Sequence, residues 1–418
     1  MEIIVVEKSP PLKGKVRING AKNSALPIIA ASLLGTEDII LEDVPDLRDV
    51  GIICEVLTSL GSEVEFIDRH TIKINSKNLN NHITRYDLVN KMRASFLVMG
   101  PLLARLGKSK TSLPGGCAIG TRPVDLHLKG FRALGVEVST EHGSIDAEVE
   151  QLIGGKIYLD FPSVGATENI MMIASMAEGE TILDNAAMEP EIIDLQNFLN
   201  KLGAKIKGAG TSTIRIKGVE KLGGCTHKII PDRIEAGTFL VAAAITGGDV
   251  LVENVISSHI KPVIAKLREA GAEVIEDGEN IRVIGNQNLQ PIDVKTLPYP
   301  GFPTDMQAQF MAMLTLTKGT SVVVETVFEN RFMHVDELKR MGANIKIDGK
   351  SAIVQGVEGL TGARVRATDL RAGAALVLAG LVAEGKTEIE DIYHIERGYD
   401  DIERKFSDLG AIIYRETI

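Results

Sequence analysis

Apolar residues along the chain gather into six long runs that recur at a regular interval. Each run is apolar around most of a helical circumference, which predicts a buried helix rather than a surface one. The runs are ALPIIAASLL (25–34), ASFLVMGPLLARL (94–106), NIMMIASMAE (169–178), GTFLVAAAITG (237–247), AQFMAMLTLTK (308–318) and AGAALVLAGLVAE (372–384). Each leads through a glycine into an extended segment such as TEDIILEDV or DVLVENV, which favours a strand.

A second motif, an amphipathic stretch ended by glycine and followed by a β-branched segment, repeats with the same period. It predicts a surface helix with a left-handed glycine cap and then a strand. The six glycines are Gly61, Gly135, Gly203, Gly271, Gly342 and Gly410, at spacings of 74, 68, 68, 71 and 68 residues. Units of about 70 residues are too long for a solenoid repeat. With 418 residues, we expect an α/β protein of two domains with three units each.

Composition narrows the class of function. The net charge of −10 and the 4% of aromatic residues, with no Trp, argue against a nucleic-acid binder. The cysteines Cys54, Cys117 and Cys225 are widely spaced, and neither they nor the scattered histidines form a metal motif. The N-terminus does not resemble a signal peptide, and no apolar run reaches the length of a membrane span. We therefore expect a cytoplasmic protein with no metal, no membrane association and no evident obligate protein partner.

Cations stand where the buried helices begin, although a helix N-terminus disfavours positive charge by about 0.3–1 kcal/mol. They are Lys22, Arg93, Arg233 and Arg371. Such residues make sense where an anion binds, but each could instead pair with a neighbouring carboxylate. The acidic residues at the starts of three of the buried helices, Asp232, Asp305 and Asp369, are interpreted as ordinary N-terminal caps.

Residues 113–127, LPGGCAIGTRPVDLH, place a thiol between glycines and an arginine. The spacing of Gly115 and Gly120 approaches that of a phosphate-binding loop, but Pro123 prevents a helix from starting there, so a nucleotide hydrolase is rejected. A Cys117–His127 hydrolase pair and an incidental surface cysteine stay open as alternatives.

Eight segments together carry a family resemblance. They are GAKNSALPIIAASLL, LPGGCAIGTRPVDLH, FPSVGATENIMM, IIPDRIEAGTFLVAAA, FPTDMQAQFMA, VFENRFMHVDEL, ATDLRAGAALVLAG and HIERGYDDIERK. From about residue 10 to the C-terminus the chain resembles the UDP-N-acetylglucosamine branch of the enolpyruvyl transferase family. The resemblance implies two similar domains, each of three βαβαββ-type units around inward helices, an inside-out α/β barrel. It implies a first domain over 21–230, carrying a catalytic loop at 113–121, and a second over 1–20 plus 231–418.

The resemblance also implies the chemistry. This family moves the enolpyruvyl group of phosphoenolpyruvate to the 3′-hydroxyl of UDP-N-acetylglucosamine and releases phosphate, the first committed step of peptidoglycan synthesis. Cys117 corresponds to the acid that protonates phosphoenolpyruvate and can carry it as a covalent adduct; no other cofactor is implied. Asp305 corresponds to the base, and Lys22 and Arg397 to catalytic cations. The family is a target of fosfomycin and serves cell shape and division.

Further positions match the family's substrate-binding residues. They are Lys22, Asn23, Arg93, Arg122, Pro123, Val124, Asp125, Leu126, Ser163, Val164, Gly165, Asp305, Val327, Arg331, Arg371 and Arg397. Asp49, Glu189 and Glu191 match residues near that site. One departure is Phe161-Pro162, which precedes Ser163 where some members have a lysine, so the uridine diphosphate contact there is expected to differ.

Two rival interpretations stay within the same fold. One is the sister enzyme that acts on shikimate 3-phosphate, which lacks this cysteine loop. The other is a UDP-sugar-binding regulatory paralogue with weak activity. The set of Lys22, Cys117, Asp305 and Arg397 argues for an active enzyme.

Overall fold

The computed structural model describes residues 2–113, 124–141, 143–286 and 288–417. They form two compact units. Unit N comprises residues 20–230 and unit C comprises residues 2–19 and 231–417, in each case as far as they are described. The chain passes from one unit to the other after Asn19 and after Ile230, close to the expected domain boundaries at residues 21 and 230. Beyond Leu113, the expected catalytic loop at 113–121 lies outside the described residues.

Unit N holds three sheets among its described residues, ordered β13-β3-β5-β4, β6-β8-β7 and β11-β12-β10-β9. Its strands are β3 (Ile39–Glu42), β4 (Glu63–Asp68), β5 (Thr71–Asn75), β6 (Lys108–Ser112), β7 (Glu137–Glu141), β8 (Ser144–Glu148), β9 (Lys156–Tyr158), β10 (Glu180–Asp184), β11 (Lys205–Lys207), β12 (Thr213–Lys217) and β13 (Cys225–Lys228). Its helices are α1 (Lys22–Ala31), η1 (Ser32–Leu34), α2 (Arg48–Ser59), α3 (Tyr86–Lys91), η2 (Arg93–Val98), α4 (Met99–Leu106), α5 (Asp125–Ala133), α6 (Val164–Ala174) and α7 (Pro190–Lys201).

Unit C also holds three sheets among its described residues, ordered β15-β16-β14-β2, β17-β18-β20-β19 and β21-β22-β1-β23. Its strands are β1 (Glu2–Glu7), β2 (Lys13–Arg17), β14 (Asp249–Glu253), β15 (Glu273–Asp277), β16 (Asn280–Ile284), β17 (Val294–Lys295), β18 (Thr320–Val324), β19 (Asn344–Asp348), β20 (Ser351–Gln355), β21 (Arg364–Arg366), β22 (Lys386–Glu390) and β23 (Ile412–Thr417). Its helices are α8 (Arg233–Thr246), η3 (Ser257–His259), α9 (Lys261–Glu269), η4 (Thr304–Met306), α10 (Gln307–Leu314), α11 (His334–Arg340), α12 (Leu370–Gly380), η5 (Ile392–Arg397) and α13 (Ile402–Asp408).

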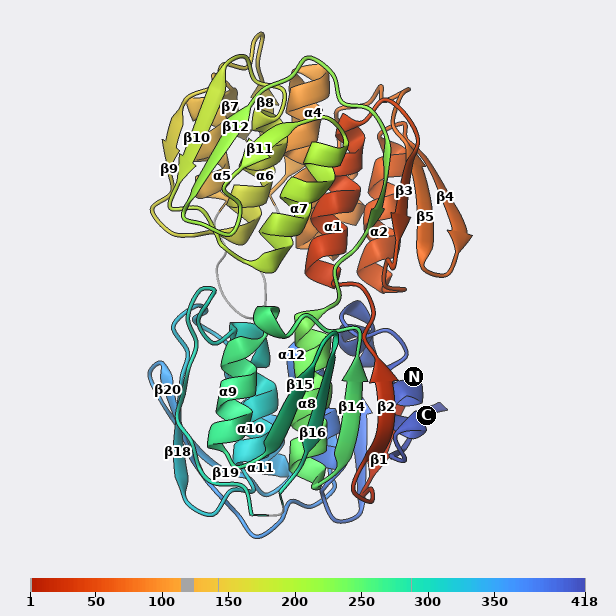
Figure 1. Ribbon diagram of the computed structural model, residues 1–418, viewed down its shortest axis with the longest axis vertical. Helices are drawn as coiled ribbons and strands as arrows, with labels where there is room; N and C mark the ends of the chain where they lie inside the picture. The colour runs from red at the N-terminus through yellow and green to blue at the C-terminus, as the bar shows by residue number, and fades with distance from the viewer. Residues whose placement is uncertain (1, 114–123, 142, 287, 418) are drawn as a thin grey trace. The chain divides into compact units, whose positions relative to one another are not determined.

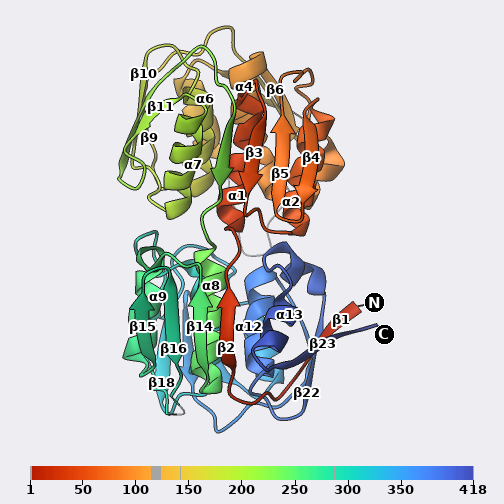
Figure 2. The ribbon, with the colours of Figure 1, turned by 45° about the vertical axis from the view of Figure 1, so that its right-hand side comes forward.

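The repeating unit is a strand, an inward helix, a parallel strand, an outer helix and a β-hairpin. The sequence β17-α10-β18-α11-β19-β20 shows it complete, with β17 and β18 parallel and the hairpin antiparallel. In Figures 1 and 2, α8, α10 and α12 lie together inside unit C, and α1, α4 and α6 inside unit N, with sheets and outer helices around them. The expected fold class, α/β with inward helices in two similar halves, is confirmed.

The six predicted glycine caps are confirmed. Gly61, Gly135, Gly203, Gly271, Gly342 and Gly410 all have a backbone φ between +92° and +111°. That region carries a steric penalty for a residue with a Cβ, so glycine ends each outer helix and turns the chain into the next strand.

The second predicted buried helix is shorter than its apolar run. Residues 93–98 form a 3₁₀ turn, and the α-helix begins only at Met99. Two backbone hydrogen bonds of a regular helix are missing at this point. Pro101 has no N–H that could donate to the carbonyl of Leu97. The N–H of Gly100 donates to Asn169 Oδ1, at 2.8 Å, rather than to the carbonyl four residues before it. The prediction of a single helix over this run is therefore wrong for its first half.

In the residues that the structure describes, no helix is long and apolar enough to cross a bilayer.

One glycine supports a direct test of the packing within a repeat. A Cβ on Gly356 would lie 1.5 Å from the carbonyl oxygen of Thr317, whereas a Cβ on Gly359 would meet no atom within 4 Å. We expect Gly356→Ala to lower the free energy of unfolding by about 1–3 kcal/mol because the backbone must move. Gly359→Ala is the matched control. Urea unfolding of both variants measures the difference, and equal midpoints would contradict this packing.

Candidate active site

In unit C, Asp305 lies between two buried arginines. Its Oδ1 accepts a hydrogen bond from Arg331 Nη2 at 2.8 Å, and its Oδ2 faces Arg371 Nη2 at 3.2 Å and Nε at 3.3 Å. The side chains of Arg331 and Arg371 are 4% and 2% exposed, while that of Asp305 is 26% exposed. Two guanidinium groups favour the ionised form of the carboxylate, which remains within reach of solvent. An ionised, accessible carboxylate can accept a proton from a bound hydroxyl.

The sequence-based interpretation of Asp305 as an ordinary helix cap is wrong. The 3₁₀ turn begins at Thr304 with Pro303 in the cap position, and Met306 holds the cap position of α10, so Asp305 stands at neither cap. Asp232 and Asp369 do cap their helices: each accepts two backbone N–H groups, at 2.8 and 3.0 Å. The carboxylate of Asp305 instead pairs with Arg331 and Arg371.

Arg371 is held by residues that sequence reasoning missed. Its guanidinium lies 5.4 Å from the ring centre of Tyr399. The Tyr399 hydroxyl is 2.9 Å from Thr238 Oγ1 and accepts from Gln309 Nε2 at 3.3 Å, and the same amide donates to the carbonyl of Asp305 at 2.9 Å. Burial opposes the charge of Arg371, but Tyr399, Asp305 and other neighbours outweigh it and raise its pKa. Arg371 therefore stays a fixed cation beside Asp305.

Val327 is positioned by a neighbouring buried carboxylate. Glu325 Oε1 accepts the backbone N–H of Val327 at 2.8 Å and that of Phe328 at 3.2 Å. Phe328 in turn lies against Arg331, whose guanidinium is 5.4 Å from its ring centre. The segment that carries Val327 is thus connected with the Arg331–Asp305 ion pair.

Arg397 ends the 3₁₀ turn η5 and is half-buried. The pKa of the nearby His394 is lowered by burial and then by the positive charge of Arg397. The predicted cation is therefore close to a neutral imidazole in unit C.

In unit N, Lys22 begins α1 and is buried with Asp49. Lys22 Nζ lies 2.7 Å from Asp49 Oδ2, and their side chains are 7% and 1% exposed. Carboxylate pairing, left open by the sequence, is thus present for Lys22 as it is for Arg371. The neighbouring Asn23 is exposed.

The buried imidazole of His127 packs against Gly165 at the start of α6. Its Nδ1 is 3.2 Å from Asn169 Nδ2, which also donates to the Phe96 carbonyl, so Nδ1 is the acceptor and the proton belongs on Nε2. A Cβ on Gly165 would lie 3.3–3.4 Å from the imidazole, so glycine allows the helix to approach. Burial, then the charge of Arg93, lowers the pKa of His127 to about 3.

The remaining matched positions of unit N that the structure describes lie at three helix starts, the first of which is half-buried Arg93 at the start of η2. Ser163 caps α6, accepting the N–H of Ala166 at 3.3 Å, and half-exposed Val164 and Gly165 follow it. Val124 is buried before α5, which begins with exposed Asp125 and half-buried Leu126. Phe161, the departure from the family pattern, is 47% exposed.

Acidic residues gather on α6 and at the start of α7. The pKa of Glu168 is raised well above its ordinary value by burial, then by Glu191 and Glu189. This electrostatic environment favours a protonated Glu168.

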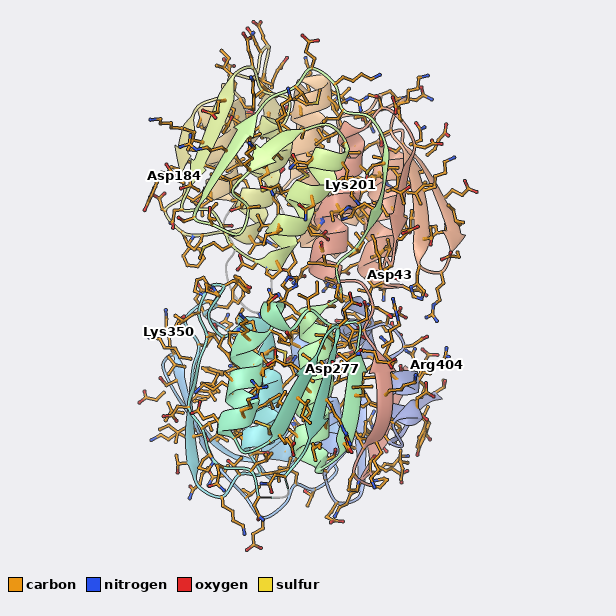
Figure 3. All side chains as sticks on the ribbon, in the orientation of Figure 1. Asp43, Asp184, Lys201, Asp277, Lys350 and Arg404 are labelled. Atoms are coloured by element: carbon orange, nitrogen blue, oxygen red, sulfur yellow. The ribbon has the colours of Figure 1, made fainter. Side chains whose placement is uncertain are left out.

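Cys117, Arg122 and Pro123 lie outside the described residues, so the predictions for them stay predictions. Of the other cysteines, Cys54 is buried, which raises its pKa to about 12, and Cys225 is half-buried with a raised pKa. Neither has the character of a reactive thiol. Within the described ranges, no group of three His, Cys, Asp or Glu residues is arranged to hold a metal ion. Outside the site, Asp184, Lys350 and Arg404 are on the periphery of their units (Figure 3).

The lowered pKa of His127 predicts a pH effect on stability. Between about pH 3 and pH 6.5 the unfolded chain binds a proton that the folded chain does not, so stability falls as the pH drops below 6.5. At pH 5 this one residue should lower the free energy of unfolding by about 2 kcal/mol. We expect His127→Gln to lose less stability than the unsubstituted protein between pH 7 and pH 5 in urea titrations. His82→Gln is the control, and equal losses for all three would refute this assignment.

Comparison with known proteins identifies the family. The chain matches the sequence model of the family described as EPSP synthase (3-phosphoshikimate 1-carboxyvinyltransferase) over residues 6–406. It is 67% identical to the UDP-N-acetylglucosamine 1-carboxyvinyltransferase of Finegoldia magna, with all of both chains covered. It is 64% identical to UDP-N-acetylglucosamine 1-carboxyvinyltransferase 1 of Caldanaerobacter subterraneus subsp. tengcongensis, with 99% of each covered.

The structural comparisons agree on the fold. The enolpyruvyl transferase NikO from Streptomyces tendae superposes with a TM-score of 0.90 at 24% identity, covering 100% of this chain and 99% of that one. EPSP synthase from Acinetobacter baumannii superposes with a TM-score of 0.78 at 19% identity, covering 100% of both chains. At these identities the likeness concerns the fold alone. The branch of the family follows from the sequence comparisons, in which relatives named UDP-N-acetylglucosamine 1-carboxyvinyltransferase are 56–67% identical over the full length. The chain is a transferase that belongs to the UDP-N-acetylglucosamine 1-carboxyvinyltransferase branch of the carboxyvinyl transferase family.

Proposed function

We propose that this protein transfers the enolpyruvyl group of phosphoenolpyruvate to the 3′-hydroxyl of UDP-N-acetylglucosamine and releases phosphate. The observation that carries the proposal is Asp305, a carboxylate 26% exposed and fixed between two buried guanidinium groups. It is suited to take the proton of a sugar hydroxyl as that hydroxyl attacks. The family membership supplies the two substrates.

The reaction proceeds by addition and then elimination. Cys117 donates a proton to the methylene carbon of phosphoenolpyruvate, and the adjacent carbon becomes oxocarbenium-like. The 3′-hydroxyl oxygen bonds to that carbon while Asp305 takes the hydroxyl proton. In the elimination the methyl carbon returns a proton to the Cys117 thiolate, phosphate leaves from the neighbouring carbon, and the double bond is restored. A thiol with an ordinary pKa near 8.5 is mostly protonated at neutral pH, so it can act as the acid. It can also hold phosphoenolpyruvate as a covalent adduct.

The charged residues divide between the two anionic substrates. Lys22, Arg122 and Arg397 are assigned to phosphoenolpyruvate, with Arg93 and Arg371 as further cations. Arginine forks match carboxylate and phosphate groups with paired hydrogen bonds. Ser163 and its two successors place backbone N–H groups at the start of α6, which suits the phosphates of a UDP-sugar.

We place this reaction in the cytoplasm, as the first committed step of peptidoglycan synthesis. The product is thereby needed for cell-wall growth, cell shape and division. Because the thiol of Cys117 is assigned to the reaction, we also expect alkylation by the epoxide fosfomycin to inactivate the enzyme.

A phosphate-release assay tests the proposal. Release should require phosphoenolpyruvate and UDP-N-acetylglucosamine together, and shikimate 3-phosphate should not replace the UDP-sugar. Tight UDP-sugar binding without turnover would instead support a regulatory paralogue. Cys117→Asp should remain active because a carboxylic acid can donate the same proton, and it should resist the epoxide.

A further inference from the structure

Near Asp305, the buried carboxylate of Glu325 accepts hydrogen bonds from separate segments of unit C. Glu325 follows β18 directly and is 1% exposed. Its Oε1 accepts the hydroxyl of Thr296 at 2.9 Å and the N–H of Val327 at 2.8 Å. Its Oε2 accepts the hydroxyl of Thr304 at 2.9 Å. No part of the proposed reaction uses this side chain.

These bonds reach Asp305 by two routes. Thr304 is its chain neighbour within the 3₁₀ turn η4, so the bond to Glu325 fixes the backbone from which Asp305 projects. The N–H of Phe328 also donates to Glu325, at 3.2 Å, and the Phe328 ring lies against Arg331, the arginine that holds Asp305 Oδ1. The same carboxylate orders the backbone of Val327.

We infer that Glu325 is a positioning residue that sets Asp305 and Val327 together for the UDP-sugar. It binds neither substrate and works through the two segments that it connects. The inference deepens the proposed function and rests on it, because Asp305 and Val327 are there assigned to the sugar substrate. Phosphoenolpyruvate is assigned to other residues, so its binding should be insensitive to Glu325.

Two substitutions of Glu325 distinguish a role in positioning the site from a role in the stability of the fold alone. Glu325→Ala leaves two hydroxyls and two N–H groups without their buried acceptor, which frees η4 and residues 326–328 to shift. A shift of about 1 Å at a catalytic group can cost about a hundredfold in rate. Glu325→Gln keeps an acceptor for the two N–H groups and offers an amide donor to Thr304 Oγ1, which can itself accept.

The matched control is Ser321→Ala. Ser321 lies on β18, the strand that leads to Glu325, is fully buried, and accepts the backbone N–H of Ile292 at 3.1 Å. Its loss removes a buried acceptor from the same strand without touching η4 or residues 326–328. It should lower the thermal midpoint and leave all steady-state constants within about twofold.

Steady-state kinetics give the first readout. We expect Glu325→Ala to raise the KM for UDP-N-acetylglucosamine about tenfold and to lower kcat by about ten- to a hundredfold, with the KM for phosphoenolpyruvate within about twofold. Glu325→Gln should recover most of this loss, to within about threefold of the unsubstituted enzyme. Equal changes in both KM values, or a loss of kcat alone in proportion to the folded fraction, would overturn the inference.

Amide hydrogen exchange gives a readout independent of activity. In Glu325→Ala, exchange should accelerate at Val327 and Phe328 and across residues 304–306, and Glu325→Gln should restore protection. Unchanged exchange at these amides would overturn the inference even in an active enzyme. If the unsubstituted protein released no phosphate, the proposed function would fail, while the exchange data would still decide whether Glu325 fixes these segments.

Discussion

Replacing Asp305 with asparagine is expected to lower kcat for phosphate release by about a thousandfold. The amide keeps the shape of the side chain but cannot take a proton, and general base catalysis contributes about 10²–10⁴-fold. UDP-N-acetylglucosamine should still bind, with its Kd by titration calorimetry within about fivefold, because most matched sugar-binding positions are elsewhere. The split between a large loss in kcat and a small change in Kd is what a base predicts.

Asp305 also neutralises two buried arginines, so the effect of Asp305→Asn on stability must be measured separately from its effect on kcat. Arg331 and Arg371 are 4% and 2% exposed, and a buried cation that loses its anion costs about 3–5 kcal/mol. Thermal unfolding of Asp305→Asn should therefore shift downwards, and kcat should be measured well below the midpoint. A folded variant whose kcat stays within tenfold of the unsubstituted enzyme would show that Asp305 is not the base.

Replacing Lys22 with methionine is expected to lower kcat/KM for phosphoenolpyruvate by a hundredfold or more, which is about 2.7 kcal/mol. It should also destabilise unit N, because Asp49, 1% exposed, loses the ammonium 2.7 Å away. Lys228→Met in the same unit is the control. Lys228 pairs with Asp43 at 3.3 Å but is 59% exposed, so its loss should change stability by less than about 1 kcal/mol.

The double variant Lys22→Met/Asp49→Asn decides between the two roles that the sequence left open for Lys22. If the lysine serves only to pair with Asp49, removing both charges should restore stability and activity together. If it binds phosphoenolpyruvate, stability should return while kcat/KM stays low. We expect the second result, by thermal unfolding and phosphate release on the same preparations.

Much of the fold could be predicted because it is periodic. The apolar runs mark the inward helices, and glycines such as Gly61 and Gly410 mark where outer helices end, since both signals are local. The first half of the 94–106 run was predicted incorrectly because the side chain of Asn169, far along the chain, takes a helical N–H there. That bond depends on how two helices pack, which the local pattern does not contain.

The candidate site was only partly accessible to sequence reasoning. Lys22 stood out as a cation at a helix start, a local anomaly with a physical meaning. Asp305 looked like a routine cap because the local pattern does not show the two arginines that reach it from residues 331 and 371. Glu325 and Tyr399 gave no local signal at all, since their roles consist of contacts between segments far apart along the chain.

The identity of the reaction product tests the central assignment most directly. The purified protein should be incubated with phosphoenolpyruvate and UDP-N-acetylglucosamine, and the nucleotide-sugar product analysed by mass spectrometry and proton NMR. We predict a UDP-sugar that carries one enolpyruvyl group as an enol ether on its 3′-oxygen, formed in equal amount to the phosphate released. Phosphate release without that product, or enolpyruvyl transfer to shikimate 3-phosphate instead, would contradict the assignment.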